Sequence, residues 1–382
     1  MKTAKTALHL AGLLLAMLTA GCFSENNRLL FDYADVEPLV NPATAALTTG
    51  DKIYGWMSDD STIVGFGGGY AYYTPNLFDS IYAVANGVAY ERIVYNDFEN
   101  IIIYPEAYTD LQLEESNNFG ETYANKLYVP KFENRVENGT TITGTHSFDV
   151  VHFINKDLGW VFTSYTAAQG ASVFASGLKV YQVVKDAFNN QNLFSLLAEL
   201  SPLYQPADAY FLNTFTGYLL VNDSANNAYL LVTNDGGLTW PNVYPISNGV
   251  PLNKLEVVYT TPNYLYAYSK TGKQIFYSSD SGQNWQSYNL LIANGGMSDL
   301  YAVDTQYAYA VSVAYADDIA SVADVYQTTN GGQNWQKVNQ NRIYADAIDF
   351  YSQLKGVATS GNVLQLTTDG GKTWKVLVYP LE

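Results

Sequence analysis

The chain has 382 residues, with 36 acidic against 19 basic side chains, a formal net charge of −17, and 15% aromatic residues including 33 tyrosines. Such an acidic surface repels nucleic-acid phosphates and anionic lipid headgroups, which argues against nucleic acid as a partner and against membrane binding through a basic patch. The aromatic content favours strands over helices. The composition therefore predicts an acidic, strand-rich protein.

The first residues have the layout of an export signal. Lys2 and Lys5 precede an apolar stretch over residues 7–18, which is too short to span a bilayer comfortably. Cys22 follows an Ala-Gly pair and is the only cysteine of the chain, so no internal disulfide can form. This arrangement resembles a lipobox, although Thr19 stands where leucine is usual.

The lipobox resemblance implies a lipoprotein whose residues 1–21 are a cleaved signal peptide and whose Cys22 carries the lipid, including palmitate. An ordinary secretory signal followed by a free cysteine is the alternative. Phe23, rather than aspartate, follows the cysteine, and the sorting rule of that family then points to the bacterial outer membrane. Without residues 1–21 the formal charge would be −19.

The remaining chain divides into a tether and one folded domain. Residues 22–50 show no sustained hydrophobic period and are interpreted as the lipidated N-terminus and tether. From residue 51 onward, short apolar and aromatic runs alternate with Gly, Asn, Asp and Pro, and a helical period occurs only around residues 192–200. Residues 51–382 are therefore predicted to form an all-β domain.

An eight-residue segment occurs four times in the second half of the chain. Residues 233–240 are Thr-Asn-Asp-Gly-Gly-Leu-Thr-Trp, and the tryptophans of the four segments are 45, 50 and 39 residues apart. Spacings of this size are typical of one four-stranded propeller blade per repeat. The repeated Ser/Thr, Asp/Asn, Gly and Trp positions are Thr233, Asp235, Gly237, Trp240; Ser278, Asp280, Gly282, Trp285; Thr328, Asn330, Gly332, Trp335; and Thr367, Asp369, Gly371, Trp374.

Each position of the segment has a physical reason in a turn. The Asp side chain accepts backbone N–H groups, Gly permits a positive φ, and Trp buries a large surface where the next strand begins. These roles account for the segment without a metal, and no twelve-residue calcium loop is present, so neither metal nor cofactor is predicted. Weaker copies occur near residues 184–190 and 95–99.

The segment resembles the Asp box, or BNR repeat, of β-propellers. In the C-terminal half of the domain the resemblance rests on the motif itself, and in the rest of the domain it rests only on the repeat spacing. Dividing residues 52–382 by the mean spacing predicts seven blades of four antiparallel strands, with six or eight as alternatives.

Asp boxes occur in sialidases, sortilin-type receptors and photosystem II assembly factors, so the box does not fix the function. A sialidase binds its substrate with three arginines, and after residue 50 this chain has only Arg92, Arg135 and Arg342. His146 and His152 are expected about 20 Å apart on one face of a strand, too far to share a metal. The sequence therefore predicts no catalytic residue and no enzymatic activity.

Two other patterns suggest binding rather than catalysis. The glycine-rich run at residues 65–69 lacks the Lys-Ser/Thr of a phosphate loop and is interpreted as a turn within a blade. Tyrosines alternate at residues 70–73, 264–268 and 307–309. These rings either form a stacking platform for sugars or a protein interface, or pack between neighbouring blades.

These patterns together favour a non-catalytic, lipid-anchored propeller that acts as an interaction scaffold or assembly factor in the bacterial cell envelope. Its partner would be an envelope or exported protein. The chain is similar to the photosystem II assembly factor family in its lipobox, size and late boxes, but it lacks the arginines of that family's docking face, so partner and docking residues do not carry over. The alternatives are a carbohydrate-binding or sialidase-like glycan-processing surface protein, and a subunit of an extracellular filament or transport machine.

Overall fold

The computed structural model describes residues 38–39, 54–57, 63–67, 70–74, 81–85, 90–96, 100–105, 111–117, 123–129, 131–137, 140–169, 172–185, 192–258, 260–290, 295–316, 320–361 and 363–378. Every regular element in these segments is a β-strand, and the strands form seven antiparallel sheets. The all-β prediction is therefore confirmed, and the described part of the chain contains as many sheets as the predicted blades. We call them blades 1 to 7 in chain order.

The strands of blades 1 to 3 belong to the first half of the chain. Blade 1 has β1 (Pro38–Leu39), β2 (Tyr54–Met57), β3 (Ile63–Gly67), β4 (Tyr70–Thr74) and β5 (Ile81–Ala85). Blade 2 has β6 (Tyr90–Asn96), β7 (Ile101–Pro105), β8 (Leu111–Ser116) and β9 (Ala124–Val129). Blade 3 has β10 (Phe132–Glu137), β11 (Thr140–Asn155), β12 (Leu158–Gln169), β13 (Ser172–Lys185) and β14 (Asn192–Leu200).

Blades 4 to 7 contain the repeated segments. Blade 4 has β15 (Gln205–Phe211), β16 (Gly217–Asn222), β17 (Ala228–Thr233) and β18 (Asn242–Ser247), and blade 5 has β19 (Lys254–Val257), β20 (Leu265–Ser269), β21 (Gln274–Ser278) and β22 (Gln286–Asn289). Blade 6 has β23 (Gly296–Ala302), β24 (Ala308–Ala316), β25 (Ser321–Thr328), β26 (Gln336–Lys337) and β27 (Ile343–Tyr344). Blade 7 has β28 (Ala347–Phe350), β29 (Gly356–Ser360), β30 (Val363–Thr367) and β31 (Lys375–Val378).

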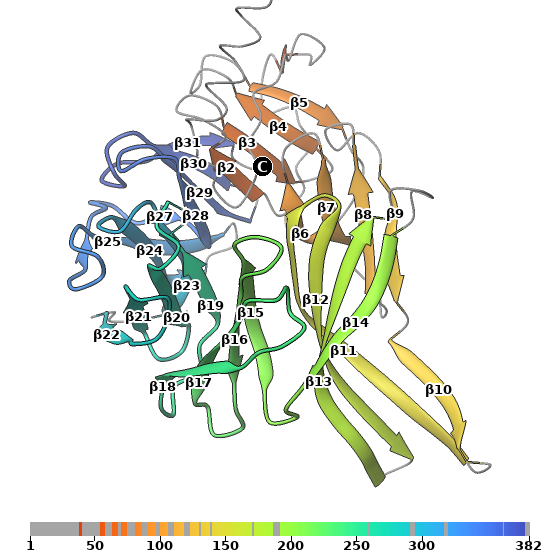
Figure 1. Ribbon diagram of the computed structural model, residues 1–382. Coiled ribbons are helices and arrows are strands. Elements are labelled where there is room, and N and C mark those ends of the chain that lie inside the picture. Colours follow the sequence, from red (N-terminus) through yellow and green to blue (C-terminus); the bar gives the residue numbers. More distant parts are fainter. Residues whose placement is uncertain are drawn as a thin grey trace, which may run out of the picture.

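The seven sheets are arranged as a ring (Figure 1). Neighbouring blades meet through β6, β11, β15, β19, β23 and β28, which are therefore the innermost strands of blades 2 to 7. β2 of blade 1 contacts β28 and β29 of blade 7, so the ring closes between the two ends of the domain. This arrangement is a β-propeller, in which radial repetition leaves only short sheet edges.

The core consists of layers between neighbouring blades. One apolar cluster joins β11 to β13 of blade 3 to β15, β16 and β17 of blade 4, and others join blades 2 and 3, 4 and 5, 5 and 6, and 6 and 7. Strands such as β20 and β29 are buried along their whole length, whereas the outermost strand β22 is largely exposed and β18 is mostly half-buried or exposed. Burial on both faces explains why the middle strands are almost continuously apolar in the sequence.

A phenylalanine opposite a glycine recurs at the junction of the first two strands. Phe211 ends β15 and pairs with Gly217 at the start of β16, so the glycine leaves room for the ring to lie across the strand. The Phe211 ring then stacks on Trp160 of blade 3, with centroids 3.6 Å apart and planes 4° apart. Phe350 pairs with Gly356 in blade 7 and stacks in the same way on the preceding blade.

Carboxylates on the innermost strands hold the next blade. Asp208 follows a bulge in β15 and accepts the backbone N–H of Leu255 in β19 at 2.9 Å. Asp299 follows a bulge at the equivalent point of β23 and accepts the N–H of Ile348 in β28 at 3.0 Å. Because the bulge adds a residue to one strand only, it changes where the carboxylate points, and each of these blades is hydrogen-bonded to the next.

The structure differs from three expectations drawn from the sequence. Residues 192–200 form strand β14 rather than a helix, because a bulge opposite Val180 and Tyr181 shifts the apolar alternation and imitates a helical spacing. The weak repeat near residue 95 follows β6, the innermost strand, so it is not equivalent to turns that follow a third strand. Two residues of the predicted tether, Pro38 and Leu39, form β1 and pair with β5.

The glycine opposite Phe211 gives a stability test. A methyl group at position 217 would come within 2.5 Å of the Phe211 ring, which Trp160 holds from the other side. We expect Gly217→Ala to lower the free energy of unfolding by about 1–3 kcal/mol through overpacking. Thermal unfolding followed by circular dichroism measures this change.

The control for this substitution is Gly177→Ala in β13. There the added methyl group would meet only the carbonyl oxygen of Leu200, at 3.5 Å. This variant should unfold at or above the wild-type temperature. Equal melting temperatures for the two variants would contradict the role assigned to the Phe211 and Gly217 pair.

Candidate interaction surface

The four repeated segments, here called the repeat turns, connect the third and fourth strands of blades 4 to 7. In blade 4, β17 ends at Thr233, whose hydroxyl accepts the backbone N–H of Gly237 at 2.9 Å and donates to Asp235 at 2.8 Å. Asp235 also accepts the N–H and the hydroxyl of Thr239, at 2.9 and 2.6 Å. The indole N–H of Trp240 closes the turn by donating to the Gly237 carbonyl at 3.2 Å.

The other three repeat turns reproduce the hydrogen bond at the strand end. The serine or threonine at the strand end accepts the N–H of the glycine four residues later at 2.9 Å in every case. The two central residues of every turn have positive φ, which glycine adopts readily and which Ser281 also adopts, at 61°. The equivalent tryptophans are Trp285, Trp335 and Trp374, of which Trp335 is buried and the other two are half-buried.

Hydrogen bonding keeps the turn aspartates charged. The bonds from Thr239, together with that from Thr233, lower the pKa of Asp235 to about 2. For Asp280 and Asp369, burial acts to raise the pKa, but the bonds from Asn284 and Thr373 outweigh it and the pKa is lowered. Each aspartate therefore stays ionised well into the acidic range.

Each described repeat turn also contacts the preceding blade or the loop between the first two strands of its own blade. In blade 4, the Gly236 N–H donates to the Phe215 carbonyl at 2.8 Å, and the Gly236 carbonyl accepts the indole N–H of Trp160 in blade 3 at 2.8 Å. In blade 6, the Gly331 carbonyl accepts the hydroxyl of Tyr264 in blade 5 at 2.5 Å. The turns therefore lock blades to one another as well as closing hairpins.

The tyrosine runs that the structure describes pack between blades. Tyr266, Tyr268 and Tyr309 are buried, and burial raises the pKa of all three, that of Tyr309 to about 12. Tyr268 donates to the Ser298 carbonyl of the next blade. Of the two possibilities left open by the sequence for residues 264–268 and 307–309, packing between blades is the one observed. The side chains of residues 70–73 lie outside the described residues.

The two histidines lie on opposite faces of β11, so the prediction that they share one face is wrong. His146 packs on Tyr165, with ring centroids 4.9 Å apart, whereas His152 packs on Tyr210 of blade 4 at 5.2 Å. The cause is a bulge at Asp149, which adds one residue between them and reverses the alternation. Burial lowers the pKa of His152 to about 4, so it is neutral at physiological pH.

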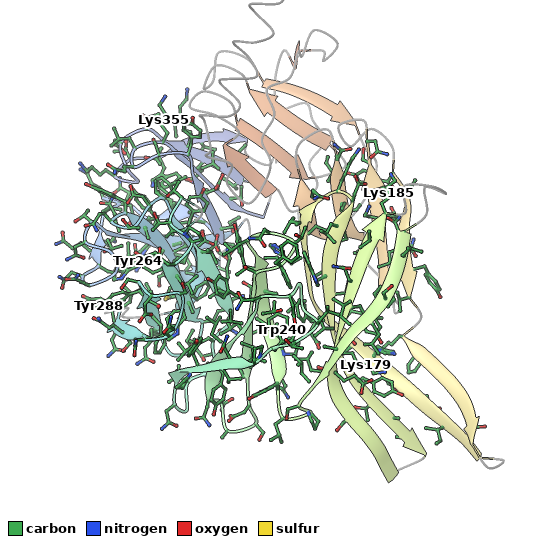
Figure 2. The ribbon with its side chains drawn as sticks, viewed as in Figure 1. Lys179, Lys185, Trp240, Tyr264, Tyr288 and Lys355 are labelled. Atoms are coloured by element: carbon green, nitrogen blue, oxygen red, sulfur yellow. The ribbon has the colours of Figure 1, made fainter. Side chains whose placement is uncertain are left out.

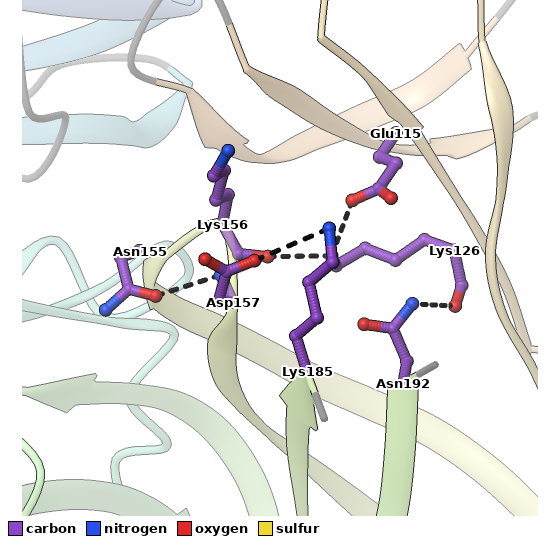
Figure 3. A network of polar contacts seen from close by, with 7 residues as sticks. All are labelled: Glu115, Lys126, Asn155, Lys156, Asp157, Lys185 and Asn192. Atoms are coloured by element: carbon purple, nitrogen blue, oxygen red, sulfur yellow. Dashed lines mark hydrogen bonds and ion pairs between the residues drawn. The ribbon is translucent and has the colours of Figure 1, made fainter. Parts of the chain in front are cut away.

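A lysine-centred network joins blade 2 to blade 3 (Figure 3). The buried ammonium of Lys126 in β9 lies 2.7 Å from Glu115 of β8 and donates to the carbonyl of Lys156, in the turn between β11 and β12, at 2.7 Å. Asn192 donates to the Lys126 carbonyl at 2.7 Å. Blades 2 and 3 are thus linked by polar side-chain contacts, whereas blades 4 to 7 have repeat turns.

The three arginines that a sialidase-type site would require lie in separate places. Arg92 is on β6 of blade 2, and Arg135 is on β10, which Figure 1 shows projecting away from the ring. Arg342 precedes β27 of blade 6, where its guanidinium lies 3.5 Å from Asp324. No group of three or more metal-ligating side chains occurs among the described residues.

Blade 4 differs from blades 5 and 6 at the face that carries the repeat turns. Phe215 and Leu238 are 65% and 56% exposed, and the bond from Gly236 to the Phe215 carbonyl joins the two loops that carry them. The equivalent positions are Asn263 and Gln283 in blade 5, and Gln306 and Gln333 in blade 6. The sequence does carry this signal, because Leu238 is the only apolar residue at its position in the four repeats.

Aromatic side chains of blades 4 and 5 differ in their position. Figure 2 shows Trp240 among the sheets, whereas Tyr288 lies at the outer margin of blade 5. Blade 7 also exposes Tyr351 and Leu354 in the loop whose carbonyl at Leu354 accepts the Gly370 N–H. We call the pair Phe215 and Leu238 the blade 4 apolar pair.

Cys22 and the predicted signal peptide, residues 1–21, lie outside the described residues. In the part of the chain that the structure covers, no helix is long and apolar enough to cross a membrane.

Comparison with known proteins shows the fold alone. No protein-family model matches this sequence, and no curated protein matches it. Among solved structures, YCF48 from Cyanidioschyzon merolae is similar over 85% of this chain and 97% of its own, with 12% identity and a TM-score of 0.53. A protein from Lactobacillus plantarum is similar over 87% and 97%, with 12% identity and a TM-score of 0.54.

An enzyme also shares the fold. A prolyl endopeptidase structure is similar over 89% of this chain and 52% of its own, with 7% identity and a TM-score of 0.52. The chain thus spans about half the length of that protein. The class of protein defined by fold and comparison is a β-propeller.

The low pKa of Asp235 predicts an acid-dependent stability. Because its pKa in the folded chain is about 2 and that of an unfolded aspartate is about 3.9, the stabilisation is complete above about pH 4 and is lost as the pH falls towards about 2. Asp235→Asn removes this titration, so its melting temperature should fall less between neutral pH and about pH 2.5 than that of the wild type.

The reciprocal substitution is available in blade 6. Asn330 already accepts the backbone N–H of Asn334 at 3.0 Å in the equivalent turn, so asparagine fits this position. Asn330→Asp should make the melting temperature fall more steeply as the pH is lowered. If both variants follow the wild-type profile, the turn carboxylates do not control acid stability.

Proposed function

We propose that this chain is a non-catalytic, lipid-anchored propeller that acts as an interaction scaffold or assembly factor in the bacterial cell envelope. The observation that carries the proposal is the blade 4 apolar pair. Large apolar side chains that are exposed together on a surface are typical of protein-binding sites. The pair is held by a turn with fixed hydrogen bonds, so it can bind without the cost of ordering a loop.

The chemistry of the surface limits the partner. The chain carries a net charge of −17, and Asp235, in the same turn as Leu238, stays ionised. A matching partner therefore presents apolar side chains bordered by basic ones, since complementary charge speeds association and suppresses wrong partners. We expect an envelope or exported protein of this kind.

Two further observations support a scaffold over glycan processing. Arg135 is on β10, which projects away from the ring, and Arg342 lies beside Asp324 before β27, which is not an innermost strand, so these two arginines do not line the ring axis together with Arg92 of β6. The tyrosines at residues 264–268 pack between blades, which removes them from a sugar-stacking platform. The fold likeness to YCF48 agrees with the sequence resemblance to assembly factors.

The docking proposal is tested by capture of a partner with tagged variants. We expect one protein to co-purify with the wild-type chain from gently solubilised membranes, and to be lost from Phe215→Ser/Leu238→Ser. The matched control, Asn263→Ser/Gln283→Ser, changes the equivalent positions of blade 5 and should retain the partner. Mass spectrometry of the bound fractions measures both.

The outcomes separate the candidate functions. Equal recovery of the partner by both double variants would exclude the blade 4 apolar pair as the docking site. Co-purification of polysaccharide without a stoichiometric protein would favour the glycan-binding alternative.

The anchor is tested separately at Cys22. If this cysteine carries the lipid, Cys22→Ser leaves a chain that moves from the membrane to the soluble fraction after salt washing, and the wild type incorporates labelled palmitate. Immunoblotting of the two fractions measures the distribution. A variant that still fractionates with membranes would show that attachment does not depend on this residue.

A further inference from the structure

Blade 3 carries an extension beyond the ring. Strands β11, β12 and β13 have 16, 12 and 14 residues, and β14 pairs only with the second half of β13. The first residues of β11 pair with β10, which lies at the outer end of the extension (Figure 1, yellow). Among the described strands, β10 has β11 as its one neighbour.

The register fixes which backbone groups of β10 point outward. The N–H of His146 donates to the Lys131 carbonyl at 2.8 Å, so positions 131 and 146 form a hydrogen-bonded pair. Hydrogen-bonded and non-hydrogen-bonded pairs alternate along an antiparallel ladder. Phe132, Asn134 and Val136 therefore direct their N–H and C=O groups away from β11, towards the free edge.

A free strand edge is a template for another strand. We propose that β10 is an interface between two copies of this chain, in which the two β10 strands pair antiparallel about a two-fold axis at Asn134. The result is one continuous sheet across the two extensions.

Two-fold symmetry restricts the register. In an isologous antiparallel pair one residue must face its own copy, and the axis passes through either a hydrogen-bonded or a non-hydrogen-bonded pair. Axes at Asn134 and at Arg135 each pair five strand positions, residues 132–136 and residues 133–137, but an axis at Arg135 places this arginine opposite its own copy and Glu133 opposite Glu137, so the charges select Asn134. An axis at any other residue of β10 pairs fewer strand positions.

The amino-acid sequence of β10 suits this register. With the axis at Asn134, Phe132 is opposite Val136, and Glu133 is opposite Arg135 of the second copy. Opposite charges and apolar residues at facing positions both stabilise a strand pair. Phe132 is 55% exposed in the single chain, so it has apolar surface available for such a contact.

Charge explains why the copies would meet here. Each chain carries a net charge of −17, so two ring bodies repel one another at close range. Salt screens this repulsion beyond about 10 Å, and the extension places β10 away from the ring. The pairing is independent of the blade 4 apolar pair, which lies on another blade.

The test is a charge swap in the full chain carrying Cys22→Ser, followed by sedimentation equilibrium. The parent should dimerise, and Glu133→Arg should weaken dimerisation about tenfold because Arg would face Arg at two positions. Glu133→Arg/Arg135→Glu should restore it. A parent that stays monomeric at all attainable concentrations, or a dimer unaffected by Glu133→Arg, would overturn the proposal.

A cross-link gives a second measurement that does not depend on affinity. Hydrogen-bonded antiparallel pairs have Cα atoms about 5.5 Å apart, within the range of a disulfide. Asn134→Cys in the Cys22→Ser background should form a covalent dimer on mild oxidation, whereas Leu203→Cys, exposed in the loop before β15 and not on β10, should not. Cross-linking equal in both variants, or absent from both, would contradict a two-fold axis at Asn134.

Discussion

Closure of the ring depends on each blade burying both faces of its middle strands against its neighbours. This packing is seen in the stacked rings of Trp160 in blade 3 and Phe211 in blade 4. Gly217 makes room for the stack because it has no side chain. Aromatic side chains carry large apolar areas in a flat shape, so they suit a narrow gap between two sheets. Aromatic residues, tyrosines among them, therefore fill the gaps between blades.

Polar contacts then fix the relative position of the blades. Carboxylates on the innermost strands, such as Asp208 and Asp299, accept backbone N–H groups from the next blade, and repeat turns accept N–H or O–H donors from the preceding one. A buried polar group must be paired, so each of these bonds tolerates one arrangement of its neighbours. The ring therefore acts as a rigid support for the loops at its faces.

Function in such a molecule depends on surface features that break the repeat. The blade 4 apolar pair and the blade 3 extension are two such departures, since the positions equivalent to the pair are polar in blades 5 and 6 and the strands of the other described blades are shorter. Both features sit on rigid sheet or turn structure. Binding to either would require little ordering of the chain, which favours a scaffold role.

The sequence by itself determined the fold class, because strand length, alternation and repeat spacing depend on local chemistry. The four repeated segments fall one to a blade, as their spacing predicts, after β17, β21, β25 and β30. Only the tertiary structure decided the faces of His146 and His152, the strand at residues 192–200, and the burial of Tyr266. A single bulge reverses an alternation without altering composition, and burial between blades depends on a neighbour some 40 residues away.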